Sequence, residues 1–344
     1  MAQSRRRRQG FRPAVALAVL VAAGALAADS PPADPLARPS VPSALATTSL
    51  LLDVALLPTG RLVAVGERGH VLVSDDGGQT WQQQIVPARS TLTRVYFADA
   101  RHGVIVGHDA VILQTDDAGS TWTKVYYAPE ARQPLFDVWL GPQGHGLAVG
   151  AYSAMLTTED FGRTWEPRHF APAVLAKPAA DDADIGLAQP HLYSLRAAGG
   201  GRLYLAGEAG RLYVSDDDGA GWRELPSPYE GTFFSVLPLG RDSLVVAGLR
   251  GHAYRSDDGG KTFTALDTGV IDLLAAATAL DGGGYALAGA SGAVLVSRDG
   301  ARLALHREAD RAAFSALVSR GPLLIAVGEH GVRRLDPATL GAAP

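Results

Sequence analysis

Short apolar runs that end in glycine recur along this chain, and each is followed by a brief polar turn and a second apolar run. Val, Leu and Ile dominate these runs, while Gly, Asp and Pro bound them, a pattern typical of strands rather than helices. The run-ending glycines are Gly66, Gly107, Gly150, Gly207, Gly248, Gly289 and Gly328. Their spacings of 41, 43, 57, 41, 41 and 39 residues predict seven copies of one unit. A repeat of roughly 40 to 45 residues is the length of a four-stranded propeller blade.

A motif of the form S-x-D-x-G-x-T-W follows the second apolar run of most units. It reads Ser74–Trp81, Thr115–Trp122 and Thr158–Trp165. A fourth copy has Gly221 at the Thr position, a fifth ends in Phe263, and a sixth survives only as far as Gly300. The Asp and the Ser/Thr hydroxyl suit a turn in which they bond backbone N–H groups, the Gly allows positive φ, and the Trp can pack between blades.

Because one residue set recurs in several blades, whereas a catalytic site occurs once, we interpret this motif as a structural feature of the fold. The residues to which we assign that role are Asp76, Trp81, Asp117, Trp122, Asp160, Trp165, Asp217, Trp222, Asp258 and Phe263.

The first unit shows how one blade is written in the sequence. We expect its strands at residues 50–57, 61–65 and 71–74, with a fourth that starts near Trp81. The whole pattern predicts an all-β, seven-bladed propeller of four-stranded antiparallel blades over residues 39–337, with an insertion at about 171–190 and a tail at 338–344. The seventh unit has no obvious fourth strand, so we expect residues 41–46 to pair with the last blade and close the ring.

The first 27 residues have the pattern of a cleaved secretory signal, followed by a linker at 28–38. Arg5–Arg8 form a basic region, an apolar run follows, and Ala25-Leu26-Ala27 has the small-x-small form of a cleavage site. A membrane anchor is the alternative, although the run falls short of the ~20 residues that a span requires. We therefore expect a periplasmic protein, with secretion as a second possibility and the export route left open.

Composition narrows the classes of function. The net charge is −4, and removal of the first 27 residues, which carry five Arg and no acid, would make it −9. An acidic chain is a poor candidate for nucleic acid, whose binding is driven by basic residues. The chain has no Cys, which excludes disulfides and thiol catalysis. Asp181, Asp182 and Asp184 fit a solvated linker better than a calcium loop. We expect a monomer that needs no metal and no cofactor.

Turns between the second and third strands lie on the ring face opposite the repeated motif, where propellers often meet their ligands. A surface that combines Arg, His and Tyr suits partner recognition, because Arg and Tyr are frequent interface anchors. The alternative is that these are polar turn tips kept for solubility. The candidate residues are Arg68, His70, His108, Tyr152, Arg211, Arg250, His252 and His330.

A glycoside hydrolase or glycan-binding propeller is the alternative function. Hydrolysis needs two carboxylates roughly 5 to 10 Å apart, and Glu67 and Glu329 are the best pair because the first and seventh blades become neighbours. Both occupy the same repeat position as Glu208, however, which favours inheritance within the repeat over a tuned acid and base. The chain has no HExxH or G-x-S-x-G motif and no Phe/Tyr-Arg-Ile-Pro segment beyond the first 27 residues.

The segments Thr93–Asp99 and His102–Gly107, together with the repeated motif, resemble the photosystem II assembly and stability factor family of seven-bladed propellers. The motif also resembles the Asp-box, or bacterial neuraminidase repeat, which occurs in sialidases, xyloglucanases and sortilin-type receptors. The resemblance covers about residues 45–336 and implies a lumenal or periplasmic factor that binds a membrane-protein assembly intermediate. We therefore expect an exported, non-catalytic scaffold for an envelope complex, with the photosynthetic role implied by the resemblance alone.

Overall fold

The computed structural model describes Met1 and residues 34–173 and 189–336. The expected signal segment, most of the linker, the centre of the insertion and the tail lie outside these residues. Among the described residues, no helix has the length and apolar character that crossing a membrane requires.

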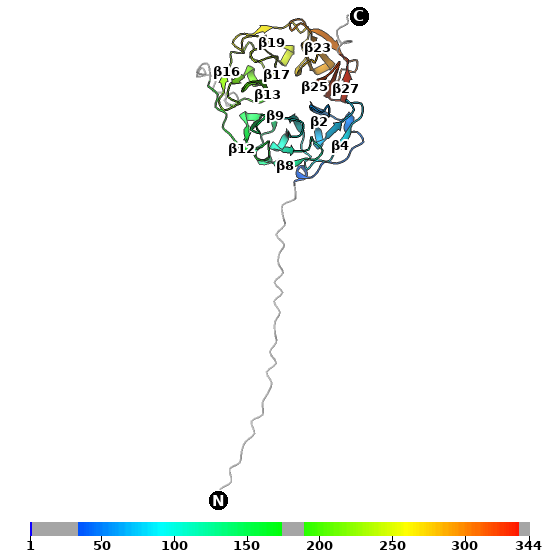
Figure 1. Ribbon diagram of the computed structural model, residues 1–344, viewed down its shortest axis with the longest axis vertical. Coiled ribbons are helices and arrows are strands. Elements are labelled where there is room, and N and C mark those ends of the chain that lie inside the picture. The colour runs from blue at the N-terminus through cyan, green and yellow to red at the C-terminus, as the bar shows by residue number, and fades with distance from the viewer. Residues whose placement is uncertain (2–33, 174–188, 337–344) are drawn as a thin grey trace. The chain divides into compact units, whose positions relative to one another are not determined.

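The compact unit that begins at Asp34 is a ring of seven antiparallel sheets, the blades, which Figure 1 shows around a common centre. Blade 1 contains β1 (Leu51–Leu56), β2 (Leu62–Gly66), β3 (Val71–Ser74) and β4 (Gln82–Gln84), and blade 2 contains β5 (Leu92–Phe97), β6 (Gly103–Gly107), β7 (Ile112–Thr115) and β8 (Thr123–Tyr126). Blade 3 contains β9 (Leu135–Leu140), β10 (Gly146–Gly150), β11 (Met155–Thr158) and β12 (Glu166–Pro167), and blade 4 contains β13 (Leu192–Gly199), β14 (Arg202–Gly207), β15 (Leu212–Ser215) and β16 (Arg223–Glu224).

Blade 5 contains β17 (Phe233–Pro238), β18 (Leu244–Gly248), β19 (Ala253–Ser256) and β20 (Thr264–Ala265), and blade 6 contains β21 (Leu274–Ala279), β22 (Tyr285–Gly289), β23 (Ala293–Ser297) and β24 (Ala304–Arg307). Blade 7 contains β25 (Phe314–Arg320), β26 (Leu323–Gly328) and β27 (Gly331–Leu335). The only helices among the described residues are 3₁₀ turns: η1 (Pro35–Ala37), η2 (Ala46–Thr48), η3 (Glu67–Gly69), η4 (His108–Ala110), η5 (Pro129–Ala131), η6 (Ala151–Ser153), η7 (Glu208–Gly210), η8 (Leu249–Gly251) and η9 (Ala290–Gly292).

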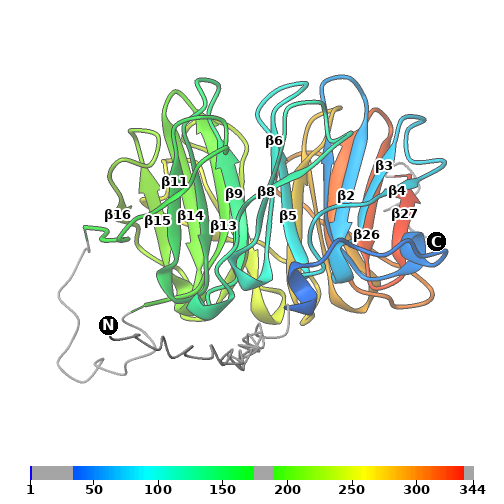
Figure 2. The ribbon, with the colours of Figure 1, turned by 90° about the horizontal axis from the view of Figure 1, so that it is seen from below.

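The strands of each blade pair in chain order, with the first strand innermost, and neighbouring inner strands contact one another around the ring. The prediction of an all-β, seven-bladed propeller is confirmed. An antiparallel meander puts the links after its first and third strands at one end and those after its second and fourth strands at the other. The end that carries the repeated motif is called the motif face, and the end that carries η3, η4, η6, η7, η8 and η9 is called the turn face (Figure 2).

The hydrophobic core is divided into clusters that each join two neighbouring blades. The aromatic residue that ends each motif contributes to the cluster shared with the preceding blade: Trp122 packs with blades 1 and 2, Trp165 with blades 2 and 3, and Trp222 with blades 3 and 4. The cluster between blades 7 and 1 includes Leu51 and Ile325 and closes the ring. Burial between blades is thus the main source of stability, because a single blade covers neither of its own faces.

The predicted closing strand at residues 41–46 is wrong. These residues form an extended segment and a turn that lead into η2, and blade 7 has three strands among the described residues. Pro42 has no N–H to offer a ladder, and neighbouring polar groups bond to blade 1 instead: Ser40 N–H donates to the Val86 carbonyl (2.8 Å), and the Gln83 amide accepts from Ser43 N–H (2.8 Å) and donates to the Val41 carbonyl (3.0 Å). The segment therefore packs beside the closure without supplying a strand.

Candidate functional site

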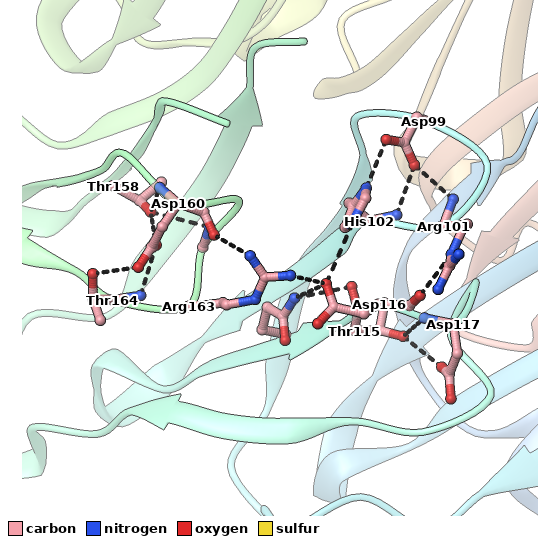
Figure 3. Close-up of polar contacts among 12 residues, drawn as sticks. Asp99, Arg101, His102, Thr115, Asp116, Asp117, Thr158, Asp160, Arg163 and Thr164 are labelled. Atoms are coloured by element: carbon pink, nitrogen blue, oxygen red, sulfur yellow. Dashed lines mark hydrogen bonds and ion pairs between the residues drawn. The ribbon is translucent and has the colours of Figure 1, made fainter. Parts of the chain in front are cut away.

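On the motif face, each Asp of the repeated motif organises its own turn (Figure 3). Asp160 Oδ1 accepts hydrogen bonds from Thr158 Oγ1 (2.9 Å) and the Thr164 N–H (2.9 Å), and Oδ2 accepts from Thr164 Oγ1 (2.7 Å). Thr158 Oγ1 in turn accepts from the Gly162 N–H (3.0 Å). Asp117 makes the equivalent bonds in blade 2. All of these hydrogen bonds lie within one turn, so the carboxylate stabilises the turn in the copies of the motif that keep its Asp, Ser/Thr and Thr residues.

A second polar network on this face links blades 2 and 3 (Figure 3). His102 Nδ1 lies 2.7 Å from Asp99 Oδ2 and its Nε2 lies 3.6 Å from Asp116 Oδ1, which also accepts from Arg163 Nη2 at 3.0 Å. Partial burial raises the pKa of Asp99, but hydrogen bonds from His102 and Arg101 outweigh it and lower the pKa to about 2. Each carboxylate in this network has a positively charged or N–H partner. The arrangement therefore fits a cross-blade link better than a reactive centre.

The turn face carries the 3₁₀ turns that follow six of the seven run-ending glycines, the exception being Gly328. The middle residue of each turn adopts a left-handed conformation with φ between 51° and 59°. The six residues are Arg68, Asp109, Tyr152, Ala209, Arg250 and Ser291. A left-handed non-glycine residue carries strain of order 1 kcal/mol. Six different side chains adopt this left-handed conformation, so it is a property of the repeat and not of one residue type. In each of these turns the conformation places the middle residue at the tip.

Six of the predicted partner-binding residues are exposed on this face, including His330, whose side chain is 57% exposed. The Arg68 side chain is 82% exposed and Tyr152 is 52% exposed. His108, Arg250 and His252 are exposed as well. The His252 ring stacks on Tyr229 with centroids 4.2 Å apart. Beside it, a pocket of about 300 Å³ is lined in part by Arg250, Tyr254 and the exposed Ile271.

Of the other two predicted residues, His70 is buried and Arg211 is partly buried, and the exposed His330 has an acidic neighbour. His70 is only 3% exposed, so its place among the surface residues was wrong: the turn directs its ring inward, and burial lowers its pKa. Arg211 forms an ion pair with Glu224, and His330 Nδ1 lies 3.1 Å from Asp310 Oδ2. These pairs could not be predicted from the sequence, because their members come from different strands or links.

The glutamates considered for hydrolysis have structural bonds. Glu208 Oε2 accepts from the His191 N–H (3.1 Å), and Glu329 Oε2 accepts from the Ala313 N–H (2.9 Å). In both blades the partner lies just before the first strand, so this repeat position anchors the entry of that strand. Glu67 Oε2 lies 4.0 Å from Arg68 Nε. These contacts favour repeat inheritance over an acid and base pair.

The inner strands carry a buried ionic cluster that was not predicted from the sequence. Arg94 bridges Asp53 (3.0 Å) and Asp137 (3.0 Å), and Arg196 pairs with Asp137. Each acid also bonds to the backbone of the next blade: Asp53 accepts a hydrogen bond from the Val95 N–H (2.9 Å), and Asp137 accepts one from the Leu195 N–H (2.8 Å). Burial raises the pKa of Asp53 and lowers that of Arg196. The available signal was a charged residue at the third position of three successive first strands.

Within residues 34–173 and 189–336, no group of three or more His, Asp or Glu side chains is placed to hold a metal ion. The turn face presents exposed Arg, His and Tyr side chains at the tips of its 3₁₀ turns.

The fold is that of a seven-bladed propeller, and its turn face carries exposed Arg, His and Tyr side chains. The chain belongs to the family described as photosynthesis system II assembly factor YCF48, whose model matches residues 34–132 and 128–326. No curated protein sequence matches the chain.

Solved structures share the fold. YCF48 from Cyanidioschyzon merolae is 18% identical, with a TM-score of 0.66 over 87% of this chain and 98% of that chain. A structure titled YCF48 bound to D1 peptide is 19% identical, with a TM-score of 0.64 over 88% of this chain and 97% of that one. A catalytically inactive virginiamycin B lyase from Staphylococcus aureus has a TM-score of 0.66 at 10% identity, over 83% of this chain and 94% of the other. At such identities these likenesses establish the fold alone.

Proposed function

We propose that this protein is an exported, non-catalytic scaffold whose turn face binds a segment of an envelope membrane-protein complex during assembly or stabilisation of that complex. In a photosynthetic cell the complex would be photosystem II, as the family description implies. In another cell the same scaffold would serve a different envelope complex.

Membership of the YCF48 family is the observation that carries this proposal, because a relative with the same fold is titled as bound to D1 peptide. Two features support it. Left-handed turn positions hold Arg68, Tyr152 and Arg250 at the tips of one face, and Arg and Tyr are among the residues that anchor interfaces most often. The secretory pattern of residues 1–27 supports export to the periplasm, which fractionation of cells that express the full chain would test.

A glycosidase is the weaker alternative. Of the three equivalent glutamates, Glu208 and Glu329 are bonded to backbone N–H groups, and no pair with separate acid and base environments emerges among the described carboxylates on this face.

The test is in-cell crosslinking of the tagged protein, followed by affinity capture and mass spectrometry of the envelope fraction. The variant that replaces Arg68, Arg250 and His252 with Ala should lose one specific membrane protein or complex while the ring stays folded. A matched variant replaces the exposed motif-face residues Lys261, Arg298 and Arg302 with Ala and should retain capture. Equal capture by both variants would remove the turn face from the proposal, and capture of no envelope protein would shift the weight to a glycan ligand.

A further inference from the structure

The second residue of each inner strand forms a ring of equivalent positions near the turn face. In chain order these residues are Leu52, Thr93, Phe136, Tyr193, Phe234, Ala275 and Ser315, and each is partly exposed. The three aromatic residues are consecutive, and they belong to β9, β13 and β17 of blades 3, 4 and 5, which are neighbours in Figure 1. Their side chains therefore meet along one arc of the ring.

The rings along this arc touch one another. Phe136 and Tyr193 stack with centroids 5.2 Å apart, and Tyr193 and Phe234 lie 4.7 Å apart. The His191 ring extends the arc: its centroid lies 6.1 Å from that of Phe136, 6.0 Å from that of Tyr193 and 4.7 Å from that of the exposed Tyr152. We call these five residues, from Tyr152 to Phe234, the aromatic row. Each ring in the row keeps part of its surface exposed, so the row presents π faces and ring edges that a partner can contact.

The charge beside the aromatic row is negative. Glu208 Oε2 lies 3.9 Å from His191 Nε2, and the Glu208 side chain remains 38% exposed. Burial raises the pKa of the Tyr193 hydroxyl, and Glu208 is the charged group that adds to this increase. The one cation–π contact found among the described residues joins Lys124 to Tyr127 in blade 2, outside the row. Within residues 34–173 and 189–336, no cation–π contact is therefore made on a ring of the aromatic row.

We propose that the aromatic row and Glu208 form a docking site for a cationic side chain, Arg or Lys, carried by the bound partner segment. Aromatic faces attract cations through their quadrupole, and a desolvated contact of this kind is stronger than an exposed one. The Glu208 carboxylate adds a charge-assisted hydrogen bond, for which an Arg guanidinium has the better geometry. This inference rests on the proposed function, and it names a positively charged side chain as the group that this part of the turn face would recognise.

An apolar or aromatic side chain is the competing occupant of the aromatic row. It would gain from the same rings, but it would remove water from the Glu208 carboxylate without supplying a positive charge, and partial desolvation of a charge is unfavourable. The sign of the local charge therefore favours the cation.

The test uses the full chain with ¹³C-labelled Tyr rings and NMR titration with three blocked tripeptides, Gly-X-Gly, in which X is Arg, citrulline or Phe. Citrulline keeps the shape of Arg and removes its charge. We expect the Arg peptide to shift the Tyr152 and Tyr193 signals and to bind roughly tenfold more tightly than the citrulline peptide.

Two variants and one control localise the effect. Glu208→Gln keeps an acceptor for the His191 N–H and should remove most of the preference for Arg over citrulline. Tyr152→Ala should weaken Arg binding without disturbing the turn, because Ala209 occupies the equivalent left-handed position in blade 4. Glu329→Gln, at the same repeat position in blade 7, should leave binding unchanged.

Equal binding of the Arg and citrulline peptides, tighter binding of the Phe peptide, equal losses in the two Gln variants, or no shift of the Tyr signals with any peptide would each overturn the inference. The peptide titration does not depend on the crosslinking experiment. Failure here with successful capture would contradict the cation site alone, whereas failed capture would contradict the proposed function.

Discussion

At the scale of the residue, the repeated Asp acts as a local acceptor. Asp160 receives three hydrogen bonds from its own turn, and Asp258 in blade 5 receives bonds from Ser256, Lys261 and Thr262. The same few groups recur in separate blades because each turn has to satisfy the same backbone N–H groups where the chain reverses.

Replacement of Asp160 by Ala should therefore lower stability by about 1 to 2 kcal/mol, since a side chain that caps several N–H groups is worth about that much. In a chain of this size the melting temperature should fall by roughly 2 to 5 °C. Glu159→Ala is the matched control, because Glu159 is the exposed neighbour in the same turn. Thermal unfolding followed by circular dichroism measures both, and equal losses would contradict the capping role.

The same carboxylate predicts a pH dependence. Burial raises the pKa of Asp160, but hydrogen bonds from Thr164 and Thr158 outweigh it and hold the pKa below its ordinary value. As the pH falls, the unfolded chain takes up the proton first, so the contribution is complete above the unfolded pKa of about 4 and is lost below it. The difference in melting temperature between the wild type and Asp160→Ala should be smaller at about pH 3.5 than at pH 7. A constant difference would contradict the linkage.

At the scale of the element, the inner strands are joined by side chains as well as by packing. Asp53 and Asp137 each accept an N–H from the next inner strand, and Ser194 accepts one from Val236 at 3.2 Å. A buried acid in such a place is tolerated because Arg94 and Arg196 neutralise it. Loss of one member leaves an unpaired buried charge, which is costly.

Asp137→Ala should accordingly destabilise the ring by about 3 to 5 kcal/mol, the range found when one partner of a buried ion pair is removed. Ser235→Ala is the control, because Ser235 occupies the equivalent third position of the inner strand in blade 5 and carries no charge. That change should cost less than about 1 kcal/mol. Urea unfolding of both variants measures the difference, and similar midpoints would show that the ionic cluster contributes little.

At the scale of the whole molecule, the ring is closed by burial and not by a shared strand. The core between blades 7 and 1 contains Leu51, Ile325 and Val327, and Ala46 of η2 packs into the same cluster. The N-terminal segment contributes to closure through this side chain, because the backbone groups of Ser40 and Val41 bond to Val86 and Gln83 of the blade 1 region.

Ala46→Asp should lower the melting temperature by several degrees, because it places a charge in a site that is 2% exposed. Leu45→Asp, one residue earlier and 69% exposed, should have little effect. Differential scanning calorimetry compares the two. Unchanged stability of the Ala46 variant would mean that η2 has no part in closure.

The sequence by itself determined the number of units, their strand order and the motif turns. These depend on contacts within about one repeat, where residue identity and spacing carry the physical constraint: Gly where φ is positive, Asp where N–H groups converge, and apolar residues where a strand is buried. The exposed tips at Arg68, Tyr152 and Arg250 followed from the same local pattern.

Only the tertiary structure decided which residues meet between blades. Asp137 and Arg196, or Tyr152 and His191, are tens of residues apart in the chain and come together because neighbouring inner strands and turns are set side by side by ring packing. The burial of His70 and the absence of a closing strand at 41–46 were settled in the same way. A periodic sequence specifies its repeat, whereas cross-blade chemistry depends on the register between repeats, which is fixed by the packing of the whole ring.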